Sequence, residues 1–119
     1  MKKNNPIRDK SLAFAIKVVK LCKWLQEEKE FVLSKQLLRS GTAIGALVRE
    51  AEQAESLKDF IHKLSISLKE ANETEYWIIL LHETNYIKKE TFDTFSSENL
   101  ELIKLLTSII KTSRQKLKK

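Results

Sequence analysis

The 119-residue chain has few of the residues that interrupt helices or cross-link chains. It contains one proline, two glycines and one cysteine. Proline and glycine commonly mark turns and helix ends, so their scarcity predicts long uninterrupted helices and an all-α fold. A single cysteine excludes a disulfide within the chain and a metal site built on several thiolates. Cys22 lies among aliphatic residues, and we interpret it as a small buried hydrophobic side chain.

Long apolar runs are also missing. No segment reaches the length that crosses a membrane, and the N-terminus MKKNNPIRDK is polar. We therefore expect one soluble, cytoplasmic domain over residues 1–119 that makes no membrane contact. The net charge is +6, with cations concentrated toward both ends of the chain and anions in the middle. This distribution predicts either contact with nucleic acid or self-association between unlike patches.

Apolar residues recur at helical spacing in four segments, which predicts an antiparallel, up-and-down four-helix bundle. Ser34 is the expected N-cap of the second helix, where Leu33 and Leu38 stand at the positions of a hydrophobic staple. Ser56, followed three residues later by Asp59, predicts a capping-box start for the third helix. The expected helices cover residues 9–28, 34–55, 57–85 and 89–116.

The only two glycines, Gly41 and Gly45, lie one turn apart on the inner face of the second expected helix. A glycine in the middle of a helix costs about 1 kcal/mol relative to alanine. We interpret the pair as a structural feature that lets another helix backbone approach closely. A phosphate-binding loop is the alternative for GTAIG, but no strand precedes it and the required lysine is absent.

Two of the expected helices carry more apolar surface than one bundle core can cover. The first has two adjacent apolar stripes, and the third has a second stripe nearly opposite its core face. We therefore expect these extra stripes to form an interface between copies of the chain. The expected interface residues are Phe14, Val18, Leu21, Ile66, Trp77 and Leu80.

One carboxylate and one imidazole, Glu75 and His82, fall on the apolar face of the third expected helix. Acid–base chemistry or a di-metal site would need further carboxylates and histidines at set spacings, which the sequence does not offer. We therefore expect no catalytic residue, no metal and no other cofactor. A buried carboxylate needs a partner, so we expect Glu75 to pair with Arg39 or Arg49, with Lys17 or solvent as the alternative.

Basic residues recur at constant spacing in the first and last expected helices. In the last helix three lysines repeat every seven residues, and in the first helix three lysines share a face with a tryptophan. Lysines neutralise phosphates and an indole stacks on a base, so this pattern predicts nucleic acid binding. The alternative is that the lysines only face solvent and the indole packs against another subunit. The candidate nucleic-acid-binding residues are Lys10, Lys17, Lys20, Trp24, Lys104, Lys111, Arg114 and Lys118.

The segment QLLRSGTAIGALVREAEQAESLKDFIHKLSISLKEANETEYW carries a more specific signal. Its distinctive features are QLLRS at 36–40, REA at 49–51, and the series Glu70, Glu73 and Trp77. On these features the chain resembles the bacterial four-helix-bundle proteins encoded in intervening sequences of large-subunit ribosomal RNA genes. That family includes the accessory variability determinant of diversity-generating retroelements. The resemblance is strong over the second and third expected helices and looser elsewhere.

The resemblance implies a homopentamer with a basic surface and no catalytic activity. For retroelement members it also implies binding to RNA or DNA and to a partner reverse transcriptase. We therefore expect a non-enzymatic, oligomeric accessory protein that binds nucleic acid, with RNA as the main candidate. The alternative is a homo-oligomeric protein-interaction module, such as a reverse-transcriptase partner, without nucleic acid contact. Leu47 departs from the family pattern, since many relatives carry asparagine there, and any contact made by that asparagine is not implied here.

Overall fold

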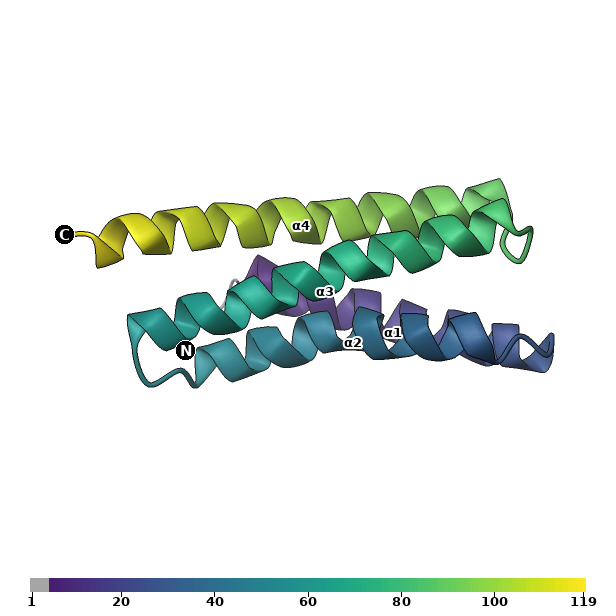
Figure 1. Cartoon of the computed structure of the whole chain (residues 1–119), viewed down its shortest axis with the longest axis horizontal. Helices are drawn as coiled ribbons and strands as arrows, with labels where there is room; N and C mark the ends of the chain where they lie inside the picture. Colours follow the sequence, from purple (N-terminus) through teal and green to yellow (C-terminus); the bar gives the residue numbers. More distant parts are fainter. Residues whose placement is uncertain (1–4) are drawn as a thin grey trace.

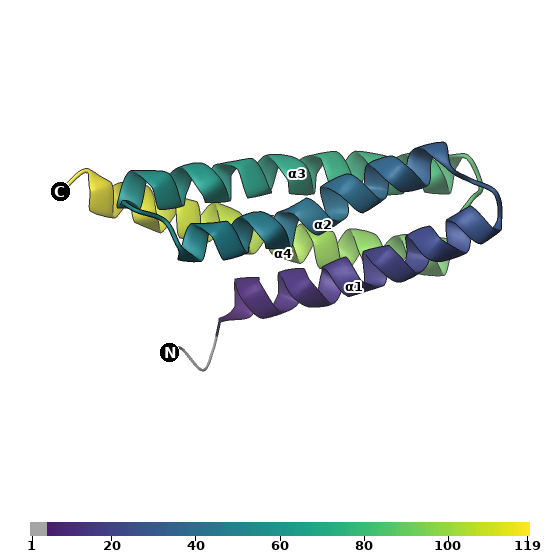
Figure 2. The same ribbon diagram turned by 90° about the horizontal axis from the view of Figure 1, so that it is seen from below.

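The computed structural model describes residues 5–119 and contains four helices, with no strand in that range. Successive helices run in opposite directions and are joined by short turns at alternate ends (Figures 1 and 2). The predicted all-α fold is confirmed, and the arrangement is that of a four-helix bundle 51 Å long. The helices are α1 (Pro6–Glu27), α2 (Val32–Glu52), α3 (Leu57–Glu83) and α4 (Lys89–Leu117).

Helix α1 begins at Pro6, ahead of the expected residue 9. The side chain of Asn5 accepts a hydrogen bond from the Arg8 N–H at 3.3 Å and caps the helix. Pro6 suits the first helical position because its missing N–H would have no partner there. The only proline in the chain therefore starts a helix and does not break one.

Helix α2 begins at Val32, and Ser34 is not its N-cap. Ser34 is buried inside the first turn, where its hydroxyl donates to the carbonyl of Glu30 at 2.8 Å. The carboxylate of Glu30 accepts from the N–H groups of Val32, Leu33 and Ser34 at 3.2, 2.9 and 2.6 Å. A glutamate that precedes the helix thus satisfies three free N–H groups, whereas a serine hydroxyl would satisfy one.

Helix α3 begins after Ser56, whose hydroxyl accepts from the Asp59 N–H at 3.0 Å. The reciprocal bond differs from a capping box, since the Asp59 carboxylate accepts from Glu55 N–H at 3.3 Å. Both bonds fix the turn between α2 and α3. The turn also forms one wall of a groove that lies between the start of α1, the end of α2 and the second half of α4.

The two glycines of α2 lie against α1. A Cβ atom added at Gly41 would lie 2.9 Å from a methyl carbon of Val18, closer than ordinary contact. One added at Gly45 would lie 3.2 Å from the Ser11 hydroxyl and 3.4 Å from its backbone carbonyl. The missing side chains therefore let α1 pack closely along α2.

The expected interface on α1 needs correction, because Phe14 and Val18 are core residues. Their exposed fractions are 1% and 0%, and the Phe14 ring packs edge-on against Phe95 at 5.9 Å. Residues at 0–1% exposure cannot contact a second copy without unfolding. The sequence showed two adjacent stripes but not which one faces the other helices. The stripe left exposed contains Leu12, Ile16 and Val19.

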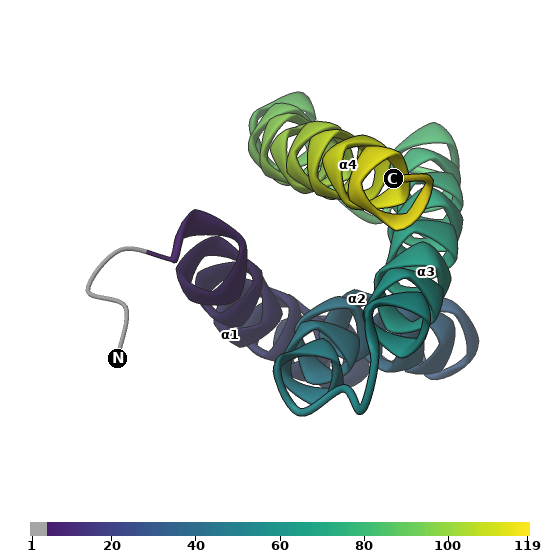
Figure 3. The same cartoon turned by 90° about the vertical axis from the view of Figure 1, so that its left-hand side faces the viewer.

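Helix α4 packs mainly against α3 and only lightly against α1. Viewed end-on, α1 and α4 lie apart at the end of the bundle that holds the start of α1 and the end of α4 (Figure 3). Two exposed ion pairs cross between these helices, from Lys10 to Glu101 at 2.9 Å and from Lys17 to Glu98 at 2.5 Å. The α1–α4 contact is therefore the most open side of the bundle.

Candidate nucleic-acid interface

Helix α4 has acidic residues in its first half and basic residues in its second half. Glu101 is the last acidic residue of the chain, and only cations follow it among the charged residues. All of these cations are exposed, and none forms an ion pair within residues 5–119. They are Lys104, Lys111, Arg114, Lys116, Lys118 and Lys119.

Lys104, Lys111 and Lys118 form a row along one face of this segment. A seven-residue step is nearly two helical turns, or about 10 Å at a rise of about 1.5 Å per residue. The row is therefore about 20 Å long. An extended line of ammonium groups without acidic neighbours can neutralise successive phosphates of one nucleic acid strand. Arg114 and Lys116, in the last turn of α4, also lie at the negative end of the helix dipole, which stabilises them there.

Lys10 and Lys17 do not belong to that unpaired set. Each pairs with a glutamate of α4, and each keeps a side-chain exposure of 48%. Exposed pairs contribute only about 0–1 kcal/mol, so a phosphate could replace the carboxylate. The carboxylates nevertheless neutralise the local charge, which makes these lysines weaker candidates for phosphate binding than the unpaired cations of α4.

Lys20 and Trp24 lie in the second half of α1, near the turn into α2. Both are exposed, and the exposed fraction of Trp24 is 46%. The α1–α2 turn and the C-terminus of α4 lie at opposite ends of the bundle (Figure 1). The structure therefore does not bring Lys20 and Trp24 together with the α4 candidates into one patch within a single chain, whereas Lys10 and Lys17 lie beside α4 through their ion pairs.

Glu75 does not pair with an arginine. It accepts hydrogen bonds from the Ser96 hydroxyl at 2.9 Å and from the Asn99 side-chain amide at 3.4 Å. Both partners belong to α4, because the face of α3 that carries Glu75 is turned away from α2. Asn99 is fully buried and also donates to the Ala71 carbonyl at 2.9 Å. Glu75 therefore helps fix α4 against α3.

Arg39 of α2 instead pairs with two acidic residues of α3, which belong to the series Glu70, Glu73 and Trp77 on which the family resemblance was based. It pairs with Glu70 at 3.1 Å and with Glu73. The indole N–H of Trp77 donates to the same Glu73 carboxylate at 2.9 Å. The Arg39 guanidinium and then the indole lower the pKa of Glu73 below its usual 4.5. No ion pair holds Arg49 within residues 5–119.

The remaining interface candidates are only partly covered by their own chain. Leu21, Ile66, Trp77 and Leu80 are all half-buried. Neighbouring positions that were not predicted for the interface are more exposed, including Tyr76 at 57% and Ile79 at 41%, although the spacing in the third helix had placed Ile79 on the core face. Apolar surface therefore remains on α1 and α3, although not at all of the residues that were expected.

Two other kinds of site find no support in the part of the chain that is described. Residues 5–119 contain no group of three or more histidine, cysteine, aspartate or glutamate side chains placed to hold a metal ion. None of the helices in this range is both long enough and apolar enough to cross a membrane.

Comparison with known proteins adds a family and a fold. A family model described as 23S rRNA-intervening sequence protein matches residues 3–108. A crystal structure from Bacteroides thetaiotaomicron, described as a protein with unknown function from the S23 ribosomal protein family, is 59% identical. The match covers 88% of this chain and 98% of that chain, with a TM-score of 0.87. No curated protein matches the chain.

Proposed function

The chain belongs to the 23S rRNA-intervening sequence protein family, and from this premise we propose a non-enzymatic accessory protein that binds nucleic acid, mainly RNA, in the cytoplasm. The second half of α4 is the binding surface. The observation that carries this proposal is the run of exposed cations after Glu101, none of which has an acidic partner within residues 5–119. Such a surface favours a polyanion over a neutral or basic ligand.

Self-association into a homopentamer is the second part of the proposal. One chain offers only a few phosphate contacts, each of which adds a small and salt-sensitive increment of affinity. Several copies bound to one strand raise the overall affinity through effective concentration. The exposed apolar residues of α1 and α3, such as Ile16 at 47% and Ile79 at 41%, are the surface that copies would cover.

The test replaces Lys104, Lys111 and Arg114 together with glutamate and measures RNA retention on filters. We expect retention to fall by more than tenfold, and the slope of log affinity against log salt to lose about two units, at roughly 0.7 per phosphate contact for single strands. The matched control replaces Lys35, Lys69 and Lys88, which are exposed elsewhere. Both variants change the net charge equally, so equal losses, or no loss in either, would refute the α4 surface.

A protein-interaction module without nucleic acid contact is the second candidate, favoured by the same exposed apolar residues. The two functions differ in their response to salt. Nucleic acid binding weakens steeply as salt rises, whereas a largely apolar contact persists. Purified protein that carries no nucleic acid at low salt and keeps its oligomeric mass at high salt would favour the interaction module.

A further inference from the structure

Two ion pairs lie along the seam between α1 and α4, just before the unpaired cations of α4 begin. Lys17 donates a hydrogen bond to Glu98. Lys10 lies 2.9 Å from Glu101. Lys104 follows Glu101 by three residues, which makes the two side chains neighbours on the surface of α4. Glu101 therefore separates the lysines of α1 from the unpaired cations of α4.

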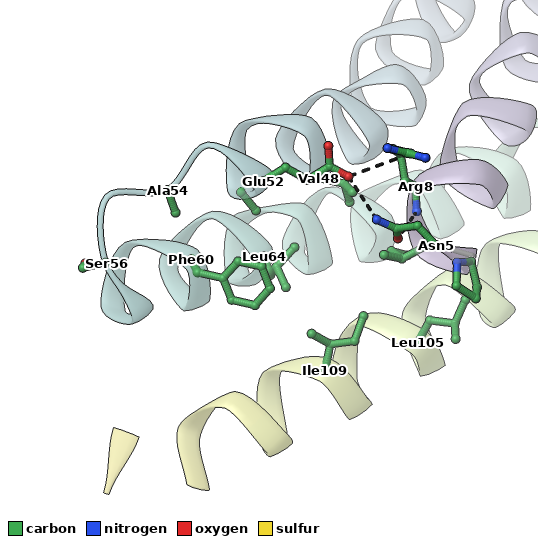
Figure 4. Close-up of a pocket in the computed structure, with 13 residues that line it drawn as sticks. Asn5, Arg8, Val48, Glu52, Ala54, Ser56, Phe60, Leu64, Leu105 and Ile109 are labelled. Carbon is green, nitrogen blue, oxygen red and sulfur yellow. Dashed lines mark hydrogen bonds and ion pairs between the residues drawn. The ribbon is translucent and has the colours of Figure 1, made fainter. Parts of the chain in front are cut away.

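The paired lysines continue the row of α4 cations in the direction of the helix axis. Helices α1 and α4 run in opposite directions, so Lys10 pairs further along α4 than Lys17 does (Figure 2). Beyond Lys10 the two helices part, and the groove between the start of α1 and the second half of α4 opens there (Figure 4). From Glu98 to Lys118 the axis of α4 rises by about 30 Å. The lysines of α1 thus lie at one end of a long line of cations.

The two pairs are open to a competing anion. The side chains of Lys10 and Lys17 are both 48% exposed, and those of Glu98 and Glu101 are 32% and 52% exposed. An exposed pair contributes only about 0–1 kcal/mol, so a phosphate can take the place of either carboxylate. A displaced carboxylate still lies beside that phosphate and repels it. The two glutamates therefore weaken RNA binding at the α1 lysines without excluding it.

We propose that Glu98 and Glu101 form an autoinhibitory contact, in which their carboxylates occupy the positions that RNA phosphates take on Lys17 and Lys10. This inference rests on the proposed function, because it concerns the regulation of the same RNA surface. A strand bound to the unpaired cations of α4 brings its next phosphates to Lys10 at a high effective concentration. The strand then displaces the carboxylates, and the binding surface extends from α4 onto α1.

The contact favours a long polyanion over a small anion. Inorganic phosphate has no second attachment on α4, so it meets each lysine at its bulk concentration and leaves the ion pairs in place. An extended strand that is already held at Lys104 and Lys111 pays the cost of displacing Glu101 from many contacts at once. The acidic half of α4 therefore raises the length of strand that the protein retains.

A purely structural role for the two ion pairs makes a different prediction. Phe14 of α1 already packs against Phe95 of α4 in the core, with 5.9 Å between the ring centroids. If the pairs only hold α1 against α4, removing the glutamates and removing the lysines should have the same effect. If the glutamates are inhibitory, their removal should strengthen RNA binding, whereas removal of the lysines should not.

The experiment measures the affinity of a fluorescein-labelled oligouridylate, long enough to span the line of cations, by fluorescence anisotropy. Glu98→Gln together with Glu101→Gln should bind about fivefold more tightly or better at 0.1 M salt. The slope of log affinity against log salt should also steepen by about 1.4, at roughly 0.7 per phosphate contact for single strands. Glu83→Gln with Glu90→Gln is the matched control, because both residues are exposed near the α3–α4 turn and the charge changes equally.

A second pair of substitutions breaks the same contacts from the other side. Lys10→Gln with Lys17→Gln removes both ion pairs and the lysines themselves, so it should not raise the affinity. Combined with the glutamine substitutions at 98 and 101, it should cancel their gain. This cancellation would assign the gain to the two lysines and not to a looser seam or to net charge.

Three outcomes would overturn the proposal: no gain from the substitutions at 98 and 101, an equal gain from those at 83 and 90, and a gain from loss of the lysines alone. Failure of the proposed function gives a different result. In that case the wild type binds no RNA, or glutamate at 104, 111 and 114 leaves binding unchanged. A protein that loses RNA through those three substitutions, but gains nothing from the two glutamines, would refute only the autoinhibitory contact.

Discussion

At the scale of single residues, burial changes what several side chains can do. Cys22 is 1% exposed, and its thiol donates to the Ser34 carbonyl at 3.3 Å. Burial, and then the charge of Glu30, raise the pKa of this thiol to about 12. Because the thiolate is the reactive form, Cys22 is a packing residue and not a nucleophile. The aliphatic neighbours in the sequence were sufficient to predict this role.

The two glycines should respond differently to alanine. Gly41→Ala places its Cβ 2.9 Å from the fully buried, β-branched Val18, which cannot move freely. We expect this overpacking to outweigh the gain in helix propensity and to lower the free energy of unfolding by about 1–2 kcal/mol. At Gly45 the nearest atom is the Ser11 hydroxyl at 3.2 Å, so Gly45→Ala serves as the control and should be close to neutral. Urea unfolding measures both, and equal effects would contradict the packing described for α1.

At the scale of elements, periodicity identified the helices better than it located their ends. Spacing of apolar residues predicted four helices, and Ser56 does cap α3. The start of α2 was misplaced because serine is a common N-cap residue and Ser34 fits that role in the sequence. In the structure the carboxylate of Glu30, which precedes the helix, accepts from the first N–H groups. The partner of Glu75 was also missed, because spacing along α3 does not reveal which neighbouring helix each face meets. The charge polarity of α4 was visible in the sequence as the absence of acids after Glu101.

The Glu30 cap provides a prediction about the start of α2. Glu30→Ala leaves the N–H groups of Val32, Leu33 and Ser34 without their carboxylate partner. Loss of a helix cap costs about 0.5–2 kcal/mol, and we expect the upper part of that range because Glu30 is only 7% exposed. Glu27→Ala, at an exposed position near the same turn, is the control. Equal midpoints in urea for the two variants would show that the carboxylate does not stabilise this helix.

At the scale of the whole molecule, the sequence predicted surplus apolar surface but assigned part of it to the wrong stripe. Phe14 and Val18 were assigned to the interface because the spacing of apolar residues shows two adjacent stripes on α1 but does not show which stripe faces the core. The groove was not foreseen at all, since it depends on α1 and α4 ending at different levels. Lys116 was likewise overlooked, although it lies in the basic half of α4.

Self-association can be tested by substitution in the exposed apolar stripe of α1, which contains Leu12, Ile16 and Val19. Trp77 is a poor site for this test, because its indole N–H donates to Glu73. Replacing Trp77 would remove this hydrogen bond within the chain as well as any contact between copies. Ile16 is 47% exposed on α1, so Ile16→Glu removes apolar contact between copies and adds a charge there without opening the core. Light scattering should give five times the 13.9 kDa chain mass for the wild type and one chain for Ile16→Glu. Val32→Glu, at 71% exposure beside the α1–α2 turn, should keep the wild-type mass. A wild-type particle of a single chain at micromolar concentration would remove the pentamer and, with it, the pooling of weak phosphate contacts on which tight RNA binding depends.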